Sequence, residues 1–100
     1  MGRYEIFTTE TFGAWIDNLK DTNVRTMIFK YVDRMADGNL GDVRYVGDGV
    51  IERKIDVGPG YRLYFTQIEN TVLLLLCGGD KSTQQRDITR AKKLRQEITQ

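Results

Sequence analysis

Four residues carry the side chains of this sequence that are best suited to chemistry. Glu52 and Lys54 are separated by one residue, and Arg62 and Tyr64 are separated in the same way further along the chain. Alternate side chains of a strand point to the same face of its sheet. If the two segments pair, a carboxylate, an ammonium, a guanidinium and a phenol therefore converge on one side of rigid strands.

Cleavage of an RNA phosphodiester can use each of these groups. The 2′-hydroxyl must lose a proton, the charge on the phosphorane must be stabilised, and the leaving 5′-oxygen must gain a proton. Glu52 is the candidate base, and Arg62 can hold a non-bridging oxygen through two N–H groups. Lys54 or Lys81 can complete the charge clamp, and Tyr64 lies beside them on the same face.

The absence of histidine restricts the mechanism. It excludes a two-histidine acid–base pair, a Ser-His-Asp triad and a His-ligated metal, so we expect a catalyst that uses no cofactor. An ordinary polar surface explains the same residues, because the outward face of a sheet is normally polar and Asp56 with Arg62 would form a common cross-strand ion pair. The hairpin alone favours this second interpretation.

A hairpin around Gly58-Pro59-Gly60 is predicted to position the four residues. Apolar and polar residues alternate over residues 50–57 and 61–68, which indicates two strands, and the glycines and proline between them indicate a three-residue turn. This register places Arg53 on the core face as its one polar residue. The predicted cross-strand pairs are Val57–Tyr61, Ile55–Leu63, Arg53–Phe65, Asp56–Arg62, Lys54–Tyr64 and Glu52–Thr66.

Hydrophobic periodicity predicts the elements of the N-terminal half. Residues 4–8 indicate a short strand. Apolar residues spaced by three and four then indicate one helix that begins near Thr9 and a second helix that Asp21 or Thr22 caps and Gly38 ends. Because the break between the two helices is short, we expect an αα-hairpin that buries its apolar stripes against another element.

The C-terminal third begins with a nearly continuous apolar run over residues 72–77, which is typical of a central strand buried on both faces. The pair Gly78-Gly79 is expected to break this strand. Ser82 and Gln85 fit a capping box that opens a last helix. The predicted fold class is α+β with the order β-α-α-β-β-β-α, in which an αα-hairpin packs on a small, curved, mainly antiparallel sheet.

Two basic features lie outside the predicted strands. Residues 38–49 contain four glycines and few apolar residues, so we expect a mobile loop that carries Arg44 and Tyr45. Between Lys81 and Arg95 there are six basic residues against one acidic residue. Such a segment can attract polyanions, although basic residues near the C-terminal end of a helix also complement its dipole. Charge alone favours the helix-dipole interpretation.

Bulk properties place the chain among small globular domains. One hundred residues with 40% hydrophobic and 29% charged side chains predict a single domain over residues 1–100. The single cysteine, Cys77, cannot form an internal disulfide. No stretch reaches the roughly 18 apolar residues of a membrane span, and residues 1–5 lack the apolar core of a signal peptide. We therefore expect a soluble, cytoplasmic protein.

Two motifs of this chain resemble those of the RelE/ParE superfamily of toxins. The first covers residues 49–65, GVIERKIDVGPGYRLYF, and the second covers residues 74–88, LLLCGGDKSTQQRDI. The branch that they resemble most is that of the HigB-type, phage Gp49-like addiction module killer proteins. The similarity extends over nearly the whole chain, and it implies the RelE-like fold.

This resemblance implies a toxin that cleaves mRNA, often on the translating ribosome, and that a cognate antitoxin silences. The antitoxin is typically a helix-turn-helix DNA-binding protein, and through it the complex represses its own operon. Carried over by position, the basic active face of the family maps to Lys54, Arg62 and Lys81 and, less closely, to Glu52 and Tyr64. The residues expected to bind RNA are Arg44, Arg53 and Arg86.

The chain departs from relatives of this superfamily in two ways. Some of them use histidines as acid and base, and this chain has none; others stack a base on a late aromatic residue, and no aromatic residue follows Phe65. Two other functions stay open. A ParE-like protein would inhibit DNA gyrase without cutting RNA, and a non-catalytic protein would use the polar sheet face only to dock its antitoxin.

Overall fold

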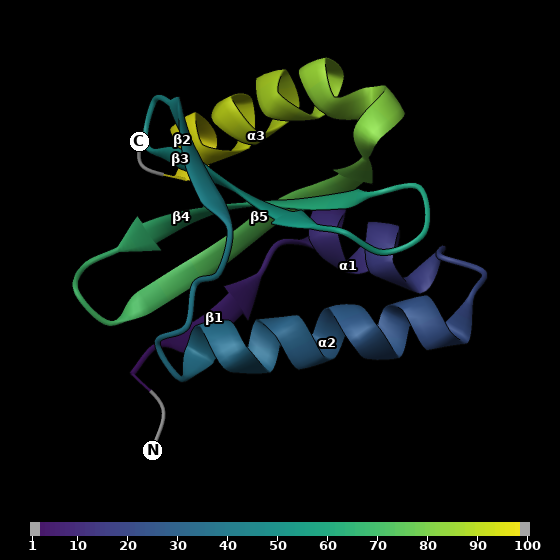
Figure 1. Cartoon of the computed structure of the whole chain (residues 1–100). Coiled ribbons are helices and arrows are strands. Elements are labelled where there is room, and N and C mark those ends of the chain that lie inside the picture. Colours follow the sequence, from purple (N-terminus) through teal and green to yellow (C-terminus); the bar gives the residue numbers. More distant parts are fainter. Residues whose placement is uncertain (1–2, 99–100) are drawn as a thin grey trace.

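Five strands and three α-helices make up the part of the chain that the structure describes, residues 3–98 (Figure 1). This structure is a computed structural model. Residues 1 and 2, which belong to the segment considered above for a signal peptide, lie outside the described residues. The elements follow in the order β1 (Glu5–Thr8), α1 (Glu10–Asp17), α2 (Thr22–Ala36), β2 (Val43–Gly47), β3 (Val50–Ile55), β4 (Tyr61–Ile68), β5 (Val72–Asp80), a 3₁₀ helix (Lys81–Thr83) and α3 (Gln84–Ile98).

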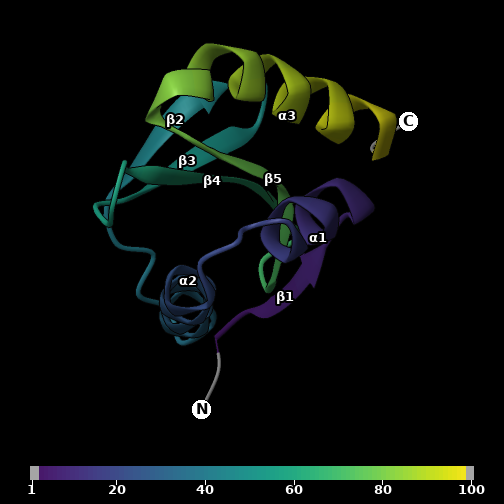
Figure 2. The same ribbon diagram turned by 90° about the vertical axis from the view of Figure 1, so that its right-hand side faces the viewer.

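The strands form one mixed sheet between two helical layers. Their order is β1-β5-β4-β3-β2, in which β1 pairs with β5 in parallel and the other neighbours are antiparallel. Helices α1 and α2 cover one face of this sheet, and α3 covers the opposite face (Figure 2). The predicted α+β class is confirmed. Within the described residues, no helix is long and apolar enough to cross a membrane.

Each face of the sheet has its own apolar core. The larger cluster packs α1 and α2 against the sheet, and the smaller cluster packs α3 against the other face. Because burying one large apolar side chain contributes about 1.5–3 kcal/mol, these clusters hold the helices on the sheet. Buried members of the larger cluster include Phe12, Ile28, Met35, Leu63 and Phe65, and those of the smaller cluster include Val50, Tyr64, Leu76, Ile88 and Ala91.

Side-chain caps determine where the first two helices begin. Thr9 is the N-cap of α1: its Oγ1 accepts a hydrogen bond from the N–H of Phe12 (3.0 Å) and donates one to the carbonyl of Leu76 on β5 (2.6 Å). Asp21, one of the two predicted caps, is the N-cap of α2 and accepts from the N–H of Asn23 (2.9 Å). Both caps satisfy N–H groups that the first turn of a helix leaves unpaired.

The predicted register of the β3–β4 hairpin was wrong by two residues. Lys54 lies opposite Arg62 rather than Tyr64. The reason is the length of the turn: β3 ends at Ile55, so residues 56–60 connect the strands instead of the three predicted residues. A shift of two residues keeps every side chain on its predicted face of the sheet, whereas a shift of one would have exchanged the faces.

A strand occupies part of the segment that was predicted to be a loop. β2 pairs antiparallel with β3 at one edge of the sheet, so Arg44 and Tyr45 lie on a strand and the predicted mobile loop was wrong. The glycines that suggested a loop lie outside or at the end of this strand; Gly41 and Gly47 have φ of 72° and 102°. A strand of five mostly exposed residues lacks the apolar alternation that identifies a strand.

β5 also extends further than predicted, because it continues through Gly78 and Gly79 to Asp80. Side chains from both layers occupy the space beside this backbone. A Cβ on Gly78 would lie 2.4 Å from the ring of Trp15, and a Cβ on Gly79 would lie 1.8 Å from the carboxylate of Asp87. Packing against both faces therefore requires the two glycines, and they do not end the strand.

The capping box predicted from Ser82 and Gln85 was wrong as well. Asp80 caps the 3₁₀ helix: its carboxylate accepts from the N–H of Ser82 (2.8 Å), and its own N–H donates to Oγ1 of Thr83 (3.4 Å). The predicted last helix is confirmed, but it begins at Gln84, directly after this 3₁₀ turn.

Candidate functional site

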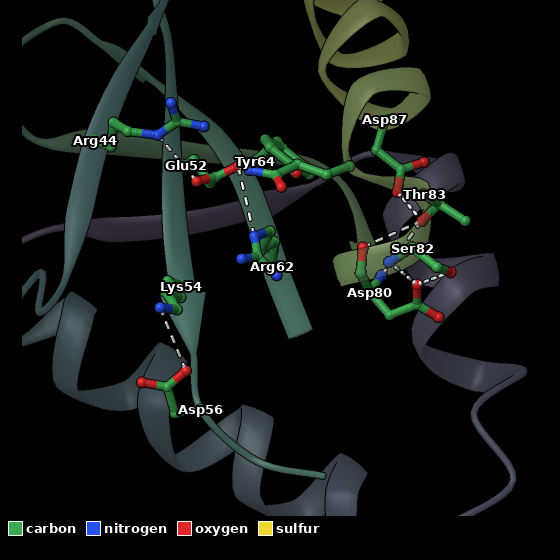
Figure 3. Close-up of polar contacts among 11 residues, drawn as sticks. Arg44, Glu52, Lys54, Asp56, Arg62, Tyr64, Asp80, Ser82, Thr83 and Asp87 are labelled. Atoms are coloured by element: carbon green, nitrogen blue, oxygen red, sulfur yellow. Dashed lines mark hydrogen bonds and ion pairs between the residues drawn. The ribbon is translucent and has the colours of Figure 1, made fainter. Parts of the chain in front are cut away.

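The predicted site lies beneath α3, and its centre is the carboxylate of Glu52, which is only 4% exposed (Figure 3). The hydroxyl of Tyr64 (3.1 Å) and Nε2 of Gln84 (2.8 Å) both donate to Oε2, and Nε of Arg44 donates to Oε1 (3.3 Å). Nε of Arg62 lies 3.8 Å from Oε2. Side chains from β2, β4 and α3 thus meet around one carboxylate of β3.

The carboxylate of Glu52 is held in its ionised form. Burial raises its pKa, but the hydrogen bonds from Gln84, Arg44 and Tyr64 and the charge of Arg44 outweigh burial, so the pKa is lowered overall. An anion that already accepts several hydrogen bonds is poorly suited to take a proton from a substrate hydroxyl. This geometry favours Glu52 as a residue that positions the basic side chains over Glu52 as a general base.

Arg62 is the most buried cation of the site, with 7% exposure. Its Nε and Nη1 are buried and have no hydrogen-bond partner among the described residues. Leaving a buried donor unpaired costs about 1–3 kcal/mol, and more for a charged group. Arg62 also lines the wall of a cavity, so its charge attracts an anion that enters, and a small shift of the side chain would let its N–H groups bind that anion.

Three adjoining cavities surround Arg62. Arg62 and Lys54 line the first (about 380 Å³) and the second (about 290 Å³). Arg44 lines the first and the third (about 500 Å³), and Lys81 lines the second and the third. Shared walls make them one continuous depression. We call it the basic groove and define it by Arg44, Lys54, Arg62 and Lys81, with Glu52 and Gln84 in its wall. The carboxylates of Asp42 and Asp56 also line it.

The two lysines of the basic groove are its exposed cations. Nζ of Lys54 lies 3.7 Å from Oδ1 of Asp56, but both side chains are well exposed (45% and 78%), so water weakens this ion pair. Lys81 opens the 3₁₀ helix, and its N–H donates to the carbonyl of Gly60 in the β3–β4 turn (3.0 Å). The backbone of Lys81 is therefore fixed to the hairpin, while its side chain lines the groove.

Tyr64 lies against Glu52 and is shielded from solvent. Its side chain is completely buried, and its hydroxyl donates to Glu52. Burial, followed by the negative charge of Glu52, raises the pKa of Tyr64 far above its ordinary value. A phenol in this position neither reaches a substrate nor releases its proton readily. The structure therefore places Tyr64 as a support for Glu52.

Two of the residues expected to bind RNA lie outside the basic groove. Arg53 points to the opposite face of the sheet, where it is 7% exposed and its guanidinium lies 4.9 Å from the ring centre of Tyr31 on α2. A ligand in the groove cannot reach it, so its assignment is corrected to a structural role. Arg86 is exposed at the start of α3, with Nε 3.8 Å from Asp87, and lines none of the three cavities.

Gln84 belongs to the site and was not predicted. Its side chain donates to Glu52 and lines two of the three cavities. In the sequence it is one of two consecutive glutamines, Gln84 and Gln85, at the start of a helix, and nothing in that pattern distinguishes them. Its position depends on how α3, which follows the 3₁₀ turn, packs on the sheet.

The described part of the chain holds no evident metal centre or activated thiol. No three His, Cys, Asp or Glu side chains gather there in a way that would hold a metal ion. Cys77 is buried, and burial raises the pKa of its thiol to about 12, so this thiol is not an activated nucleophile. The basic groove is therefore the arrangement on which a functional argument can be built.

A protein of Haemophilus influenzae is 45% identical to this chain over 94 residues, which cover 94% of the chain and 95% of that protein. The chain belongs to the same family. The similarity extends over nearly the whole length of both proteins, and the Haemophilus protein is described as an uncharacterized protein. No family model matches the chain. Membership of this family assigns no activity, so the function is inferred from the site.

Proposed function

We propose that this chain is the toxin of a type II toxin–antitoxin system and acts as an mRNA endoribonuclease without a metal ion or other cofactor. The basic groove carries this proposal, because the charge of buried Arg62 lies at a cavity wall that Arg44, Lys54 and Lys81 extend. A groove with cations along its walls suits the phosphates of a single RNA strand.

The resemblance of residues 49–65 and 74–88 to the RelE/ParE superfamily supports the same proposal. These segments form β3, most of β4, most of β5 and the start of α3, which together supply most of the basic groove. A RelE-like fold of the HigB type is part of the proposal, and the pair of helices on one face of a mixed sheet supports it. We place the protein in the cytoplasm, where mRNA is translated.

The groove suits cleavage by transfer of the phosphate to the neighbouring 2′-oxygen. The 2′-oxygen attacks phosphorus as its proton passes to water, and the 5′-oxygen leaves with a proton, so the products are a 2′,3′-cyclic phosphate and a 5′-hydroxyl. Arg62 stabilises the charge on the non-bridging oxygens, as pre-positioned donors do in other enzymes. Lys54 or Lys81 supplies the proton of the leaving oxygen, and Glu52 keeps Arg62 in place.

A cognate helix-turn-helix antitoxin is the proposed protein partner. It would silence the toxin by covering the basic groove, and the complex would bind operator DNA through the antitoxin alone. The concentration of cations around Arg62 supports this partner, because a segment with carboxylates would complement it. Purification of the tagged chain from its native host should recover a small DNA-binding protein, and its absence from repeated purifications would contradict this part of the proposal.

Induced expression of the chain alone tests the function. The wild-type chain is expected to arrest growth and to produce new 5′-hydroxyl ends inside coding regions within minutes. Arg62→Ala should leave transcripts intact. Lys30→Ala is the matched control, because Lys30 is an exposed cation of α2 on the opposite side of the sheet, and it should cleave as the wild type does.

Two results would contradict the proposal at different levels. Growth arrest with intact transcripts and a DNA-damage response would replace the ribonuclease with a ParE-like gyrase inhibitor. Full RNA cleavage by a variant that carries both Arg62→Ala and Lys54→Ala would mean that the protein is a ribonuclease whose active site lies outside the basic groove. Repeating the assay with purified protein, with and without ribosomes, shows whether cleavage depends on translation.

A further inference from the structure

A second basic cavity lies beyond the basic groove, beside the C-terminal half of α3. Its volume is about 480 Å³. It forms where α3 runs past the turn between β2 and β3, which lie side by side at this edge of the molecule (Figure 1). The mechanism proposed above uses none of its residues. We call it the distal cavity; it is lined by Asp48, Thr89, Lys92, Lys93, Arg95 and Gln96.

Contacts with the sheet position the cations of the distal cavity. Nζ of Lys92 lies 3.8 Å from Oδ2 of Asp48 in the β2–β3 turn. Nε of Arg95 donates to Oγ1 of Thr66 on β4 (2.9 Å). Gly49, with φ of 79°, makes room for this arginine, since a Cβ there would lie 2.3 Å from its Nε. The cavity is therefore built by packing between α3 and the strands.

The surface of α3 between the two sites carries almost no negative charge. From Lys81 to Arg95 the only acidic residue in the sequence is Asp87. It is 2% exposed, and its carboxylate accepts a hydrogen bond from the side chain of Thr83, so it is withdrawn from the surface. Arg90 is exposed on the same helix. A polyanion that follows α3 would meet cations at both ends and along the path.

Helix α3 joins the distal cavity to the basic groove. Ile88 lines the third cavity of the groove and Thr89 lines the distal cavity, so consecutive residues of one helix border both sites. From Gln85, at the groove, to Lys92 the helix rises about 10 Å at 1.5 Å per residue. That is a short distance along an extended nucleic-acid strand, so one strand can contact both sites.

We propose that the distal cavity binds backbone phosphates of the same single-stranded RNA whose cleaved phosphate lies in the basic groove. This inference rests on the proposed ribonuclease function and extends its substrate site along α3. Contacts to phosphates raise affinity for any sequence and do not select bases. Lys92 and Lys93 touch no reacting atom in this arrangement, so they act in binding and not in cleavage.

Removal of two lysines tests this inference. Lys92→Gln with Lys93→Gln removes two cations and leaves Arg95, whose contact with the sheet is structural. The variant is titrated at several salt concentrations with a fluorescent RNA of about 12 nucleotides, made uncleavable by 2′-O-methylation. The matched control, Lys20→Gln with Lys30→Gln, removes the same charge from exposed positions near or on α2.

The expected result is weaker binding with a smaller dependence on salt. For the double variant at Lys92 and Lys93, the slope of log affinity against log salt should fall by roughly 1.4, about 0.7 for each lost phosphate contact to a single strand. An RNA of about 4 nucleotides, which fills only the basic groove, should bind wild type and variant equally. In cleavage assays KM should rise while kcat is unchanged, and the control should match the wild type throughout.

The outcomes separate this inference from the function on which it rests. If the wild type binds and cleaves RNA but the Lys92 and Lys93 variant keeps the same affinity and salt slope, the inference is overturned and the function stands. If the variant keeps RNA binding and loses only antitoxin binding, the cavity docks an acidic protein segment and the inference is again overturned. If the wild type neither binds nor cleaves RNA, both fall.

Discussion

Arg53 and Arg62 lie on paired strands and are equally buried at 7% exposure, but they face opposite sides of the sheet. Arg53 is enclosed: its guanidinium lies 4.9 Å from the ring centre of Tyr31, and Nη1 donates to the carbonyl of Lys54 (2.6 Å). Arg62 has the carboxylate of Glu52 on one side and the basic groove on the other. An arginine side chain is thus covered on one face of the sheet, at Arg53, and lies beside a cavity on the other face, at Arg62.

This difference shows that burial alone does not identify a functional arginine. The stem and flat head of Arg53 cover the ring of Tyr31, a cation–π contact that belongs to the packing of α2. Arg62 lies at a cavity wall, where an anionic ligand can pair with its charge; both arginines have a buried Nε without a hydrogen bond, so that feature does not distinguish them. The open space beside a cation, more than its exposed area, indicates a binding role.

Replacing Arg62 should have the largest effect. Arg62→Ala is expected to lower the rate constant of RNA cleavage about 10²–10³-fold, as the loss of a pre-positioned transition-state donor does elsewhere. Arg62→Lys keeps the charge but loses the fork of N–H groups, so it should recover only part of the rate. Single-turnover kinetics with purified protein measure both. A cleavage rate for Arg62→Ala within a few-fold of the wild type would contradict the different roles assigned to Arg62 and Arg53.

Neutralising Glu52 should have the second-largest effect, which is a loss of stability. Glu52→Gln leaves Arg62 buried without its carboxylate and is expected to lower the free energy of unfolding by about 3 kcal/mol. Urea denaturation measures the change. A loss below about 1 kcal/mol would mean that Glu52 does not hold the site together, and that its contacts behave as a surface ion pair does.

The pH dependence of stability sharpens this test. The folded state lowers the pKa of Glu52, so the contribution of Glu52 to stability is present in full above the ordinary glutamate pKa of about 4.3 and is lost as pH falls through the lower pKa of the folded protein. The wild type should therefore lose its advantage over Glu52→Gln as the solution is acidified. Equal differences between the two proteins at pH 7 and in acid would contradict the assigned shift.

Arg53→Ala tests the other half of the comparison. It removes the cover of Tyr31 and should lower the free energy of unfolding by about 1–3 kcal/mol, as loss of a buried packed side chain does. The cleavage rate constant of the folded variant should be unchanged, because Arg53 lies on the face away from the groove. Thermal unfolding and cleavage are measured on the same preparation. A large loss of cleavage without a loss of stability would restore Arg53 to the site.

Tyr64→Phe should give the smallest effect. The ring stays in its pocket and only the hydroxyl that donates to Glu52 is lost, so the expected change in unfolding free energy is about 1 kcal/mol. The cleavage rate should fall slightly at most, since Gln84 and Arg44 still donate to the carboxylate. A loss of cleavage comparable with that of Arg62→Ala would instead make Tyr64 a catalytic residue.

The sequence was sufficient to place four site residues on one face of the sheet. Alternation in β3 and β4 put Glu52, Lys54, Arg62 and Tyr64 together, and an error of two residues in the register did not separate them. The burial of Glu52, Arg62 and Tyr64 could not be predicted, because it depends on α3 covering that face. The contribution of Gln84 could not be predicted for the same reason, since the rotation of α3 comes from packing between elements distant in sequence.

Glycines caused two of the other errors, in two opposite ways. Near β2, glycines with positive φ flank a short strand and made the whole segment resemble a loop. In β5, Gly78 and Gly79 continue a strand that they were expected to end, because Trp15 and Asp87 occupy the space of the absent side chains. A glycine needed for backbone conformation and one needed for close packing are identical in a sequence.

The glycine pair of β5 lets side chains from both helical layers approach the sheet closely where the site begins. At Gly79 the carboxylate of Asp87 occupies the place of a side chain, so the first turn of α3 comes almost to the backbone of the sheet. This close approach brings Gln84 within 2.8 Å of Glu52. Any side chain at Gly79 would act as a spacer between the two layers. A residue that lines none of the three cavities thus allows α3 to form one wall of the basic groove.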